Sequence, residues 1–114
     1  MDAEELISRY NAGDREFSGA YLANASLSGV ALSEANLSEA NLAGADLSGA
    51  NLKRACLDQA NLNEADLRGA NLEGTFLYGA SLSGANLEGA NLDGVKLYGA
   101  DLSGATLPDG MVHE

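Results

Sequence analysis

The stretch ANLEGANLDG, residues 85–94, contains two copies of a five-residue unit that runs through most of the chain. Alanine stands two places before the central residue in fifteen units, Asn or Asp one place before it in ten, and glycine two places after it in twelve. Such an internal repeat decides the fold. The nineteen central residues, which we expect to form the core, are Phe17, Leu22, Leu27, Leu32, Leu37, Leu42, Leu47, Leu52, Leu57, Leu62, Leu67, Leu72, Leu77, Leu82, Leu87, Leu92, Leu97, Leu102 and Leu107.

A period of five fits neither of the regular secondary structures. On an α-helix, five residues turn the chain by about 140° beyond a full circle, so the leucines would be spread around the cylinder. On a flat strand, an odd step sends successive leucines to opposite faces. A coil that bends once per unit repeats the same inward geometry each time. We therefore expect alanine and leucine to point inward and glycine to form corners.

The units ANLSE at 35–39, ADLSG at 45–49 and ANLEG at 85–89 resemble those of pentapeptide-repeat proteins, a family abundant in cyanobacteria. The resemblance covers residues 15–107 and implies an all-β solenoid, a right-handed quadrilateral β-helix with four units per coil. Coils of 20 residues would number between four and five. The expected neighbours at this spacing are Lys53 with Glu73, Arg68 with Glu88, Tyr78 with Tyr98, and a ladder of Asn51, Asn71 and Asn91.

The first thirteen residues predict a short α-helix that caps one end of the solenoid. Asp2 and Glu5 resemble a capping box. The apolar residues Leu6, Ile7 and Tyr10 share one helical face with Ala3. A helix lying on a membrane is disfavoured because the segment is acidic. We expect the cap over 1–13, the β-helix over 14–107, and a turn and tail over 108–114.

The other end has less to cover it. Pro108-Asp109-Gly110 predicts a turn, after which Met111 and Val112 have two alternatives. Either they fold back over the last coil, or two chains meet end to end. The sequence thus leaves a monomer and an end-to-end homodimer open.

Two departures from the unit also carry expectations. Arg15 occupies an alanine position, where a guanidinium cannot enter an apolar column without a partner. The first unit is therefore expected to be distorted. Every corner from Gly69 to Gly104 is glycine, whereas earlier corners carry side chains, which predicts two corner geometries. The earlier corners in question are Glu34, Glu39, Arg54, Gln59 and Glu64.

The composition argues against an enzyme, a cofactor or a metal site. The one histidine, His113, lies in the tail, so no catalytic triad is expected. Cys56 has no nearby histidine and is interpreted as a surface thiol. Asp46 and Asp66 are expected on adjacent coils, as solvated carboxylates with slightly raised pKa values rather than as a cation site. The absence of a signal sequence or a long apolar run predicts a cytoplasmic protein without membrane association.

The net charge of −11 predicts no direct binding to nucleic acid. Some pentapeptide-repeat proteins mimic DNA and bind DNA gyrase, and the resemblance makes this the alternative function. The carboxylates that would replace phosphates are Glu34, Glu39, Asp58, Glu64, Glu73, Glu88 and Asp93. They are expected on all four faces of a short rod, too sparse for the phosphate spacing of DNA.

A cluster of aromatic residues is the candidate binding surface. Phe76, Tyr78 and Tyr98 are expected to point outward on one face, where they would bind an unidentified protein partner. The alternative is that they only stabilise neighbouring coils. We interpret the chain as a non-enzymatic rigid repeat scaffold or protein-interaction module.

Overall fold

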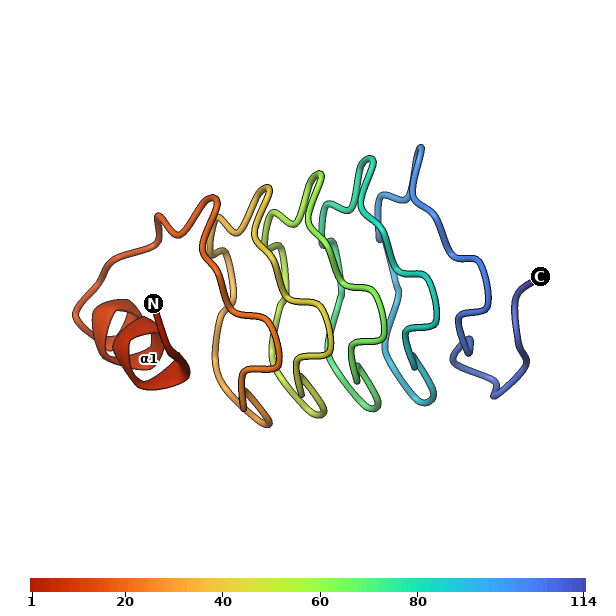
Figure 1. Cartoon of the computed structure of the whole chain (residues 1–114), viewed down its shortest axis with the longest axis horizontal. Helices are drawn as coiled ribbons and strands as arrows, with labels where there is room; N and C mark the ends of the chain where they lie inside the picture. The colour runs from red at the N-terminus through yellow and green to blue at the C-terminus, as the bar shows by residue number, and fades with distance from the viewer.

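The computed structural model describes every residue from Met1 to Glu114 and consists of one helix followed by stacked coils (Figure 1). The helix, α1, spans Ala3–Asn11. Isolated parallel β-bridges then join residues 20 positions apart, from Glu16 with Asn36 to Asn86 with Thr106. The molecule measures 39 × 23 × 23 Å. Its two equal widths fit a coil with four equal sides, and each coil contains four five-residue units.

A β-turn closes each side of the coil. In each, the N–H of the inward alanine position donates to the carbonyl of the preceding leucine, as Ala60 does to Leu57 at 3.0 Å. The third residue of the turn has a positive φ in all eighteen units from Gly19 to Gly104. Since the second residue does not, these are type II turns. Four turns in 20 residues give the coil its four corners.

The expectation of two corner geometries is wrong. Six corners without glycine adopt φ values of 58° to 62°, close to those of the glycine corners. They are Asn24, Glu34, Glu39, Arg54, Gln59 and Glu64. Hydrogen bonds between coils fix the path of each corner, for example from the N–H of Gln59 to the carbonyl of Tyr78 at 2.8 Å. The N–H of each of these six residues donates to the next coil, and the ladder therefore imposes the corner conformation on them.

Some later glycines make room for these side chains. A Cβ atom on Gly79 would meet the amide of Gln59, and one on Gly84 would meet the carboxylate of Glu64. The corner side chain of one coil thus lies across the corner of the next. The glycine bias of the C-terminal half therefore reflects stacking as well as backbone freedom.

Replacing Glu64 with glycine should raise the free energy of unfolding by about 0.5 to 1 kcal/mol. A left-handed backbone costs a residue with a Cβ atom about 1–2 kcal/mol, and the greater freedom of the unfolded glycine chain offsets part of the gain. Urea unfolding measures the change. Glu88→Gly is the control, because Glu88 is exposed and does not have a positive φ. Glu88→Gly should lower the free energy of unfolding. The strain argument would be contradicted if Glu88→Gly raised this free energy or if Glu64→Gly lowered it.

The Asn or Asp before each leucine stabilises the backbone of its own unit. In all ten such units its Oδ1 atom accepts a hydrogen bond from the N–H two residues later, as Asn51 does from Lys53 at 3.1 Å. This explains the residue preference, since only these side chains form such Asx turns. The predicted ladder of Asn51, Asn71 and Asn91 forms through the backbone, while each side chain bonds within its own unit.

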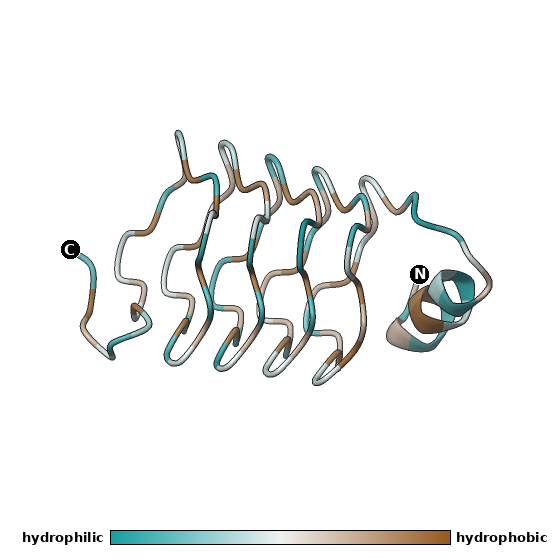
Figure 2. Ribbon diagram, turned by 180° about the vertical axis from the view of Figure 1, so that it is seen from behind, coloured by the Kyte–Doolittle hydropathy of each residue, from teal (hydrophilic) through white to brown (hydrophobic).

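Helix α1 covers the first coil with its apolar side (Figure 2). Asp2 caps the helix by accepting from the N–H of Glu5 at 2.9 Å. Leu6 is fully buried, while Ile7 and Tyr10 are partly buried against the core. The Tyr10 hydroxyl donates to the carbonyl of Ser33 at 2.8 Å. The helix therefore shields the first leucines from solvent and donates a hydrogen bond to one carbonyl at the edge of the first coil.

Two of the four residues that replace alanine are polar, and neither disrupts the column. The Arg15 guanidinium stays outside, 3.7 Å from the centre of the Tyr10 ring, and donates to the Tyr10 carbonyl at 2.9 Å. The expected distortion is thus avoided by turning the side chain toward α1. Thr75 is fully buried, and its hydroxyl donates to the carbonyl of Leu52 at 2.7 Å. A buried polar atom is tolerated there because it is hydrogen-bonded.

We expect the attachment of α1 to depend on pH through a carboxylate at its junction with the first coil. The N–H of Glu16 and the guanidinium of Arg9, at 2.8 Å, lower the pKa of Asp14 below its usual value of 3.8. A lowered pKa means stability that is present above pH 3.8 and is lost as the pH falls through the folded-state value. We expect hydrogen exchange of the α1 amides to accelerate in that range, and Asp14→Asn to remove the pH dependence. A variant as pH-sensitive as the parent protein would contradict this assignment.

Beside the last coil the chain reverses direction near its C-terminus (Figure 1). Thr106 and Val112 form an antiparallel bridge, and the N–H of Leu107 donates to the carbonyl of Met111 at 2.8 Å. The tail thus folds back along one side of the last coil, but Met111 and Val112 remain exposed.

Burial of the leucine column is uneven. Fifteen central residues, from Phe17 to Leu87, are at most 2% exposed. The remaining four, Leu92, Leu97, Leu102 and Leu107, are only partly buried. These four do not have the closed environment expected of a core, because no further coil or helix covers them.

Candidate protein-binding surfaces

Phe76, Tyr78 and Tyr98 lie on one side of the solenoid near its C-terminal end; we call them the aromatic patch. They flank the inward Leu77 and Leu97, and their exposed fractions are 37%, 39% and 85%. The rings of Phe76 and Tyr78 are 6.3 Å apart and tilted by 46°. The register of the repeat places these rings outward, because the neighbouring leucines point inward.

Tyr78 and Tyr98 do not form the ring pair expected from the 20-residue spacing. Tyr98 shares a column with Tyr78, but the ring pair that forms is the one between Phe76 and Tyr78. Lys96 lies with its ammonium 5.6 Å from the centre of the Phe76 ring and donates to the carbonyl of Gly94 at 2.7 Å. Phe76 is thus held in place by two neighbours, while Tyr98 is left largely free.

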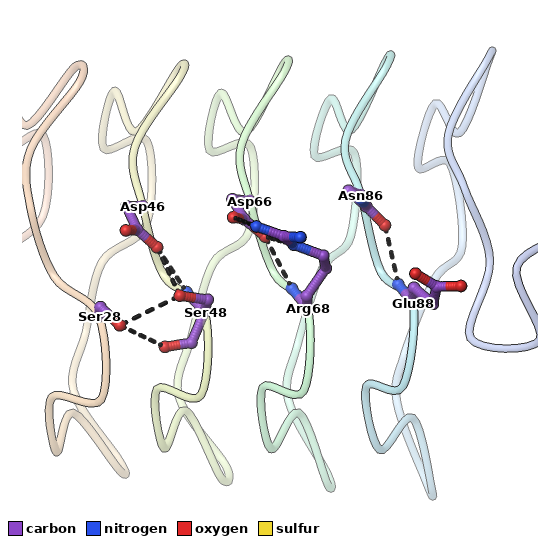
Figure 3. A network of polar contacts seen from close by, with 7 residues as sticks. All are labelled: Ser28, Asp46, Ser48, Asp66, Arg68, Asn86 and Glu88. Carbon is purple, nitrogen blue, oxygen red and sulfur yellow. Dashed lines mark hydrogen bonds and ion pairs between the residues drawn. The ribbon is translucent and has the colours of Figure 1, made fainter.

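A second side of the solenoid carries a row of hydrogen-bonded polar residues (Figure 3). Asp46 accepts from the N–H and the hydroxyl of Ser48, and Ser48 in turn contacts Ser28. Arg68 binds the carboxylate of Asp66 through two nitrogens, at 2.9 and 2.7 Å (Figure 3). Ser48 and Arg68 thus bind the carboxylates of Asp46 and Asp66, the pair weighed above as a cation site.

The same contacts correct two expectations. Arg68 shares a column with Glu88 but binds Asp66 within its own unit (Figure 3). The hydrogen bond from Arg68 lowers the pKa of Asp66, whereas a slightly raised pKa was expected. Asp101 also has a lowered pKa, because the hydroxyl and N–H of Ser103 donate to it. The carboxylates of Asp46, Asp66 and Asp101 are therefore all hydrogen-bonded within their own units.

The basic side chains of the coils are engaged in contacts within the chain. Lys53 and Glu73 lie 3.9 Å apart across neighbouring coils, as the 20-residue register predicts. Arg54 lies 3.9 Å from Glu34 in the same way. Glu34 and Glu73, two of the seven carboxylates considered as phosphate substitutes, are therefore paired with cations. The acidic surface is interrupted by ion pairs along its length.

The remaining reactive groups are dispersed. Burial raises the pKa of the Cys56 thiol, which disfavours its nucleophilic thiolate form. His113 belongs to the folded-back tail, where its N–H donates to the carbonyl of Ala105 at 2.7 Å. No three His, Cys, Asp or Glu side chains lie close enough together to hold a metal ion.

One hollow of about 420 Å³ lies between the start of α1 and the first coil. Its lining includes Asp2, Glu4 and Tyr21 and no basic residue. The only helix, α1, is too short and too polar to cross a membrane.

Comparison with known proteins identifies the repeat. The family model for pentapeptide repeats matches residues 16–54, 45–84 and 77–107, with eight copies. A pentapeptide repeat protein from the cyanobacterium Cyanothece 51142 has 41% identity and a TM-score of 0.75 over 75% of this chain. This chain spans 58% of that protein's length. A search of curated proteins gave no match.

Two further solved structures resemble the chain. A pentapeptide repeat protein from the thylakoid lumen of Arabidopsis thaliana has 31% identity and a TM-score of 0.82, covering 91% of this chain and 73% of its own. One from Nostoc PCC 7120 has 42% identity and a TM-score of 0.62, covering 82% and 74%. Together with the repeat itself, these matches show that the chain belongs to the pentapeptide-repeat family.

Proposed function

We propose that this chain is a non-enzymatic rigid scaffold that binds a protein partner through the aromatic patch. The observation that carries the proposal is that Phe76, Tyr78 and Tyr98 are exposed together on one side of the solenoid. Aromatic side chains are enriched at protein interfaces because they contribute large apolar areas at a small entropy cost. The hydrogen-bonded coils beneath hold the patch rigid, so binding would not require the backbone to reorganise.

The gyrase-directed alternative has weaker support. A DNA mimic needs a dense array of negative charge, about one per 1.7 Å of axis. Here Glu34 and Glu73 are paired with basic residues, and the remaining candidate carboxylates are spread over all four sides. An acidic surface of this kind is suited to keeping the rod soluble.

The proposal also includes the handedness of the coils and the compartment in which the protein works. We expect the coils to wind right-handed, because connections between parallel strands of one sheet are right-handed in about 98% of cases. We also propose the cytoplasm as the working compartment, since the single Cys56 forms no disulfide and is suited to a reducing environment.

A photo-crosslinking amino acid at position 98 should capture a partner in cells of the source organism, whereas the same group at position 21 should not. Tyr98 and Tyr21 are both exposed aromatics, but Tyr21 lies outside the patch near the opposite end. The crosslink at 98 should disappear when Phe76 and Tyr78 are replaced with serine.

The double serine variant also separates binding from stability. If the patch serves binding, we expect its free energy of unfolding to fall by no more than about 1 kcal/mol, since both side chains are more than a third exposed. A much larger loss would assign the rings to stabilising the coils. Equal crosslinking at positions 21 and 98 would also refute the proposal.

A further inference from the structure

The C-terminal end of the solenoid presents an apolar surface. No helix equivalent to α1 covers it. Leu92, Leu97 and Leu102 are partly exposed there, beside the exposed Met111 and Val112 of the tail. We call these five residues the C-terminal platform. Figure 1 shows the last coil open at this end, with the tail along one side only.

The N-terminal end of the same chain shows what closes such a surface. There the nine-residue α1 lies across the coil, and Phe17, Leu22, Leu27 and Leu32 are at most 2% exposed. Tyr10 is the only helix side chain that binds the free edge of the coil, through the carbonyl of Ser33. Coverage of the leucines, rather than continued backbone pairing, is therefore what closes an end.

A further coil is a poor fit for the C-terminal end. The carbonyl of His113 accepts from Gly104, and that of Met111 accepts from Leu107, so the tail already occupies one side of the edge. On the other three sides, the N–H groups of the edge form no hydrogen bond within the chain. They are those of Leu92, Gly94, Leu97, Gly99 and Leu102. A parallel coil could not pair around the whole perimeter without displacing the tail.

The charge around the platform favours a basic partner over a second copy. Glu88, Asp93, Asp101, Asp109 and Glu114 belong to the last coil and tail, against the single Lys96, whose ammonium is engaged with Phe76. Two copies meeting end to end would bring these acidic rims together. An end of 23 × 23 Å also offers roughly 500 Å² per partner, below the roughly 800 Å² of a standard interface.

We propose that the C-terminal platform binds the apolar face of a basic amphipathic helix supplied by a partner protein. Its apolar stripe would cover Leu92, Leu97 and Leu102, as α1 covers the first coil. Its flanking lysine or arginine side chains would lie against the acidic rim. Such helix-in-groove recognition places apolar anchors at i, i+3, i+4 and i+7. This surface is distinct from the aromatic patch, so the inference does not depend on the proposed function.

A synthetic peptide tests the proposal directly. The probe is an amphipathic helix of leucine and lysine with the leucines at i, i+3, i+4 and i+7; its control replaces every lysine with glutamate. In a ¹⁵N-labelled titration of the full chain, the lysine peptide should cause saturable shifts at the five free edge amides. The glutamate peptide should bind at least ten-fold more weakly. Shifts that map elsewhere, or none up to millimolar peptide, would overturn the proposal.

Charge variants give a second, independent measurement. Asp93→Asn with Asp101→Asn should weaken binding of the lysine peptide at least five-fold, and asparagine preserves the hydrogen bond that Asp101 accepts from Ser103. Glu4→Gln with Glu39→Gln removes the same charge from exposed sites away from the platform and should leave affinity within two-fold. Equal effects of the two pairs would overturn the assignment. So would a self-associated dimer that protects the five edge amides without any peptide.

Discussion

Replacing Leu57 with alanine should lower the free energy of unfolding by about 2 to 5 kcal/mol. Leu57 is fully buried in the middle of the leucine column, between the coils that carry Leu37 and Leu77. The walls around it are held by hydrogen bonds of 2.7 Å on both sides, from Leu37 to the Cys56 carbonyl and from Leu57 to the Phe76 carbonyl. A rigid wall cannot collapse into the cavity, so the loss should lie toward the upper end. Urea unfolding followed by circular dichroism measures it.

Leu102→Ala is the matched control, because Leu102 has the same position in its unit but is partly exposed. Its loss should be less than half that of Leu57→Ala, since less apolar surface returns to water. Equal losses at the two sites would show that burial in the column does not set stability.

The repeat period predicts the architecture because a coil is the solution that buries every fifth residue. It also predicts the inward alanines, since small residues must alternate with leucine where four walls meet. The corner conformation could not be predicted at Glu39 or Glu64, because local propensity disfavours a positive φ there. Hydrogen bonds to the neighbouring coil override that propensity, and these bonds are not visible in one unit.

Pairing across coils was predictable only where no closer partner exists. Lys53 follows the neutral Asn51 in its unit, and it reaches Glu73 on the next coil. Arg68 follows Asp66, whose carboxylate is already positioned by the Asx turn, so Arg68 binds within its own unit. A contact two residues away requires less ordering of a long side chain than one across coils.

The two candidate surfaces also differ in how far the sequence predicts them. The aromatic patch follows from the register, since residues next to an inward leucine must point outward. The sequence left the C-terminal platform as one of two alternatives, because its exposure depends on the path of the tail after Pro108. The sequence allowed Met111 and Val112 to cover the last leucines, whereas the structure pairs them along one side.

Replacing Leu6 with aspartate should detach α1 without unfolding the central coils. Leu6 contributes about 1.5–3 kcal/mol by burial, and its fully buried position cannot hold a carboxylate without a partner. A nine-residue helix is not stable alone, so undocking also unfolds it. We expect hydrogen-exchange protection of the α1 amides to fall by at least about 100-fold, equivalent to about 2.7 kcal/mol. Amides between residues 45 and 85 should keep their protection, because coils of a solenoid depend mainly on their neighbours.

Ser8→Asp adds the same charge to the exposed side of α1 and matches any effect on the helix dipole. It should leave protection of α1 within about three-fold, so that the difference between the variants isolates the buried contact. Detachment would expose the first leucines, and light scattering should show concentration-dependent association of the Leu6 variant alone. Loss of protection through all coils would contradict the nearest-neighbour account. Full protection of α1 in the Leu6 variant would mean that the contact at Leu6 does not hold the helix to the coil.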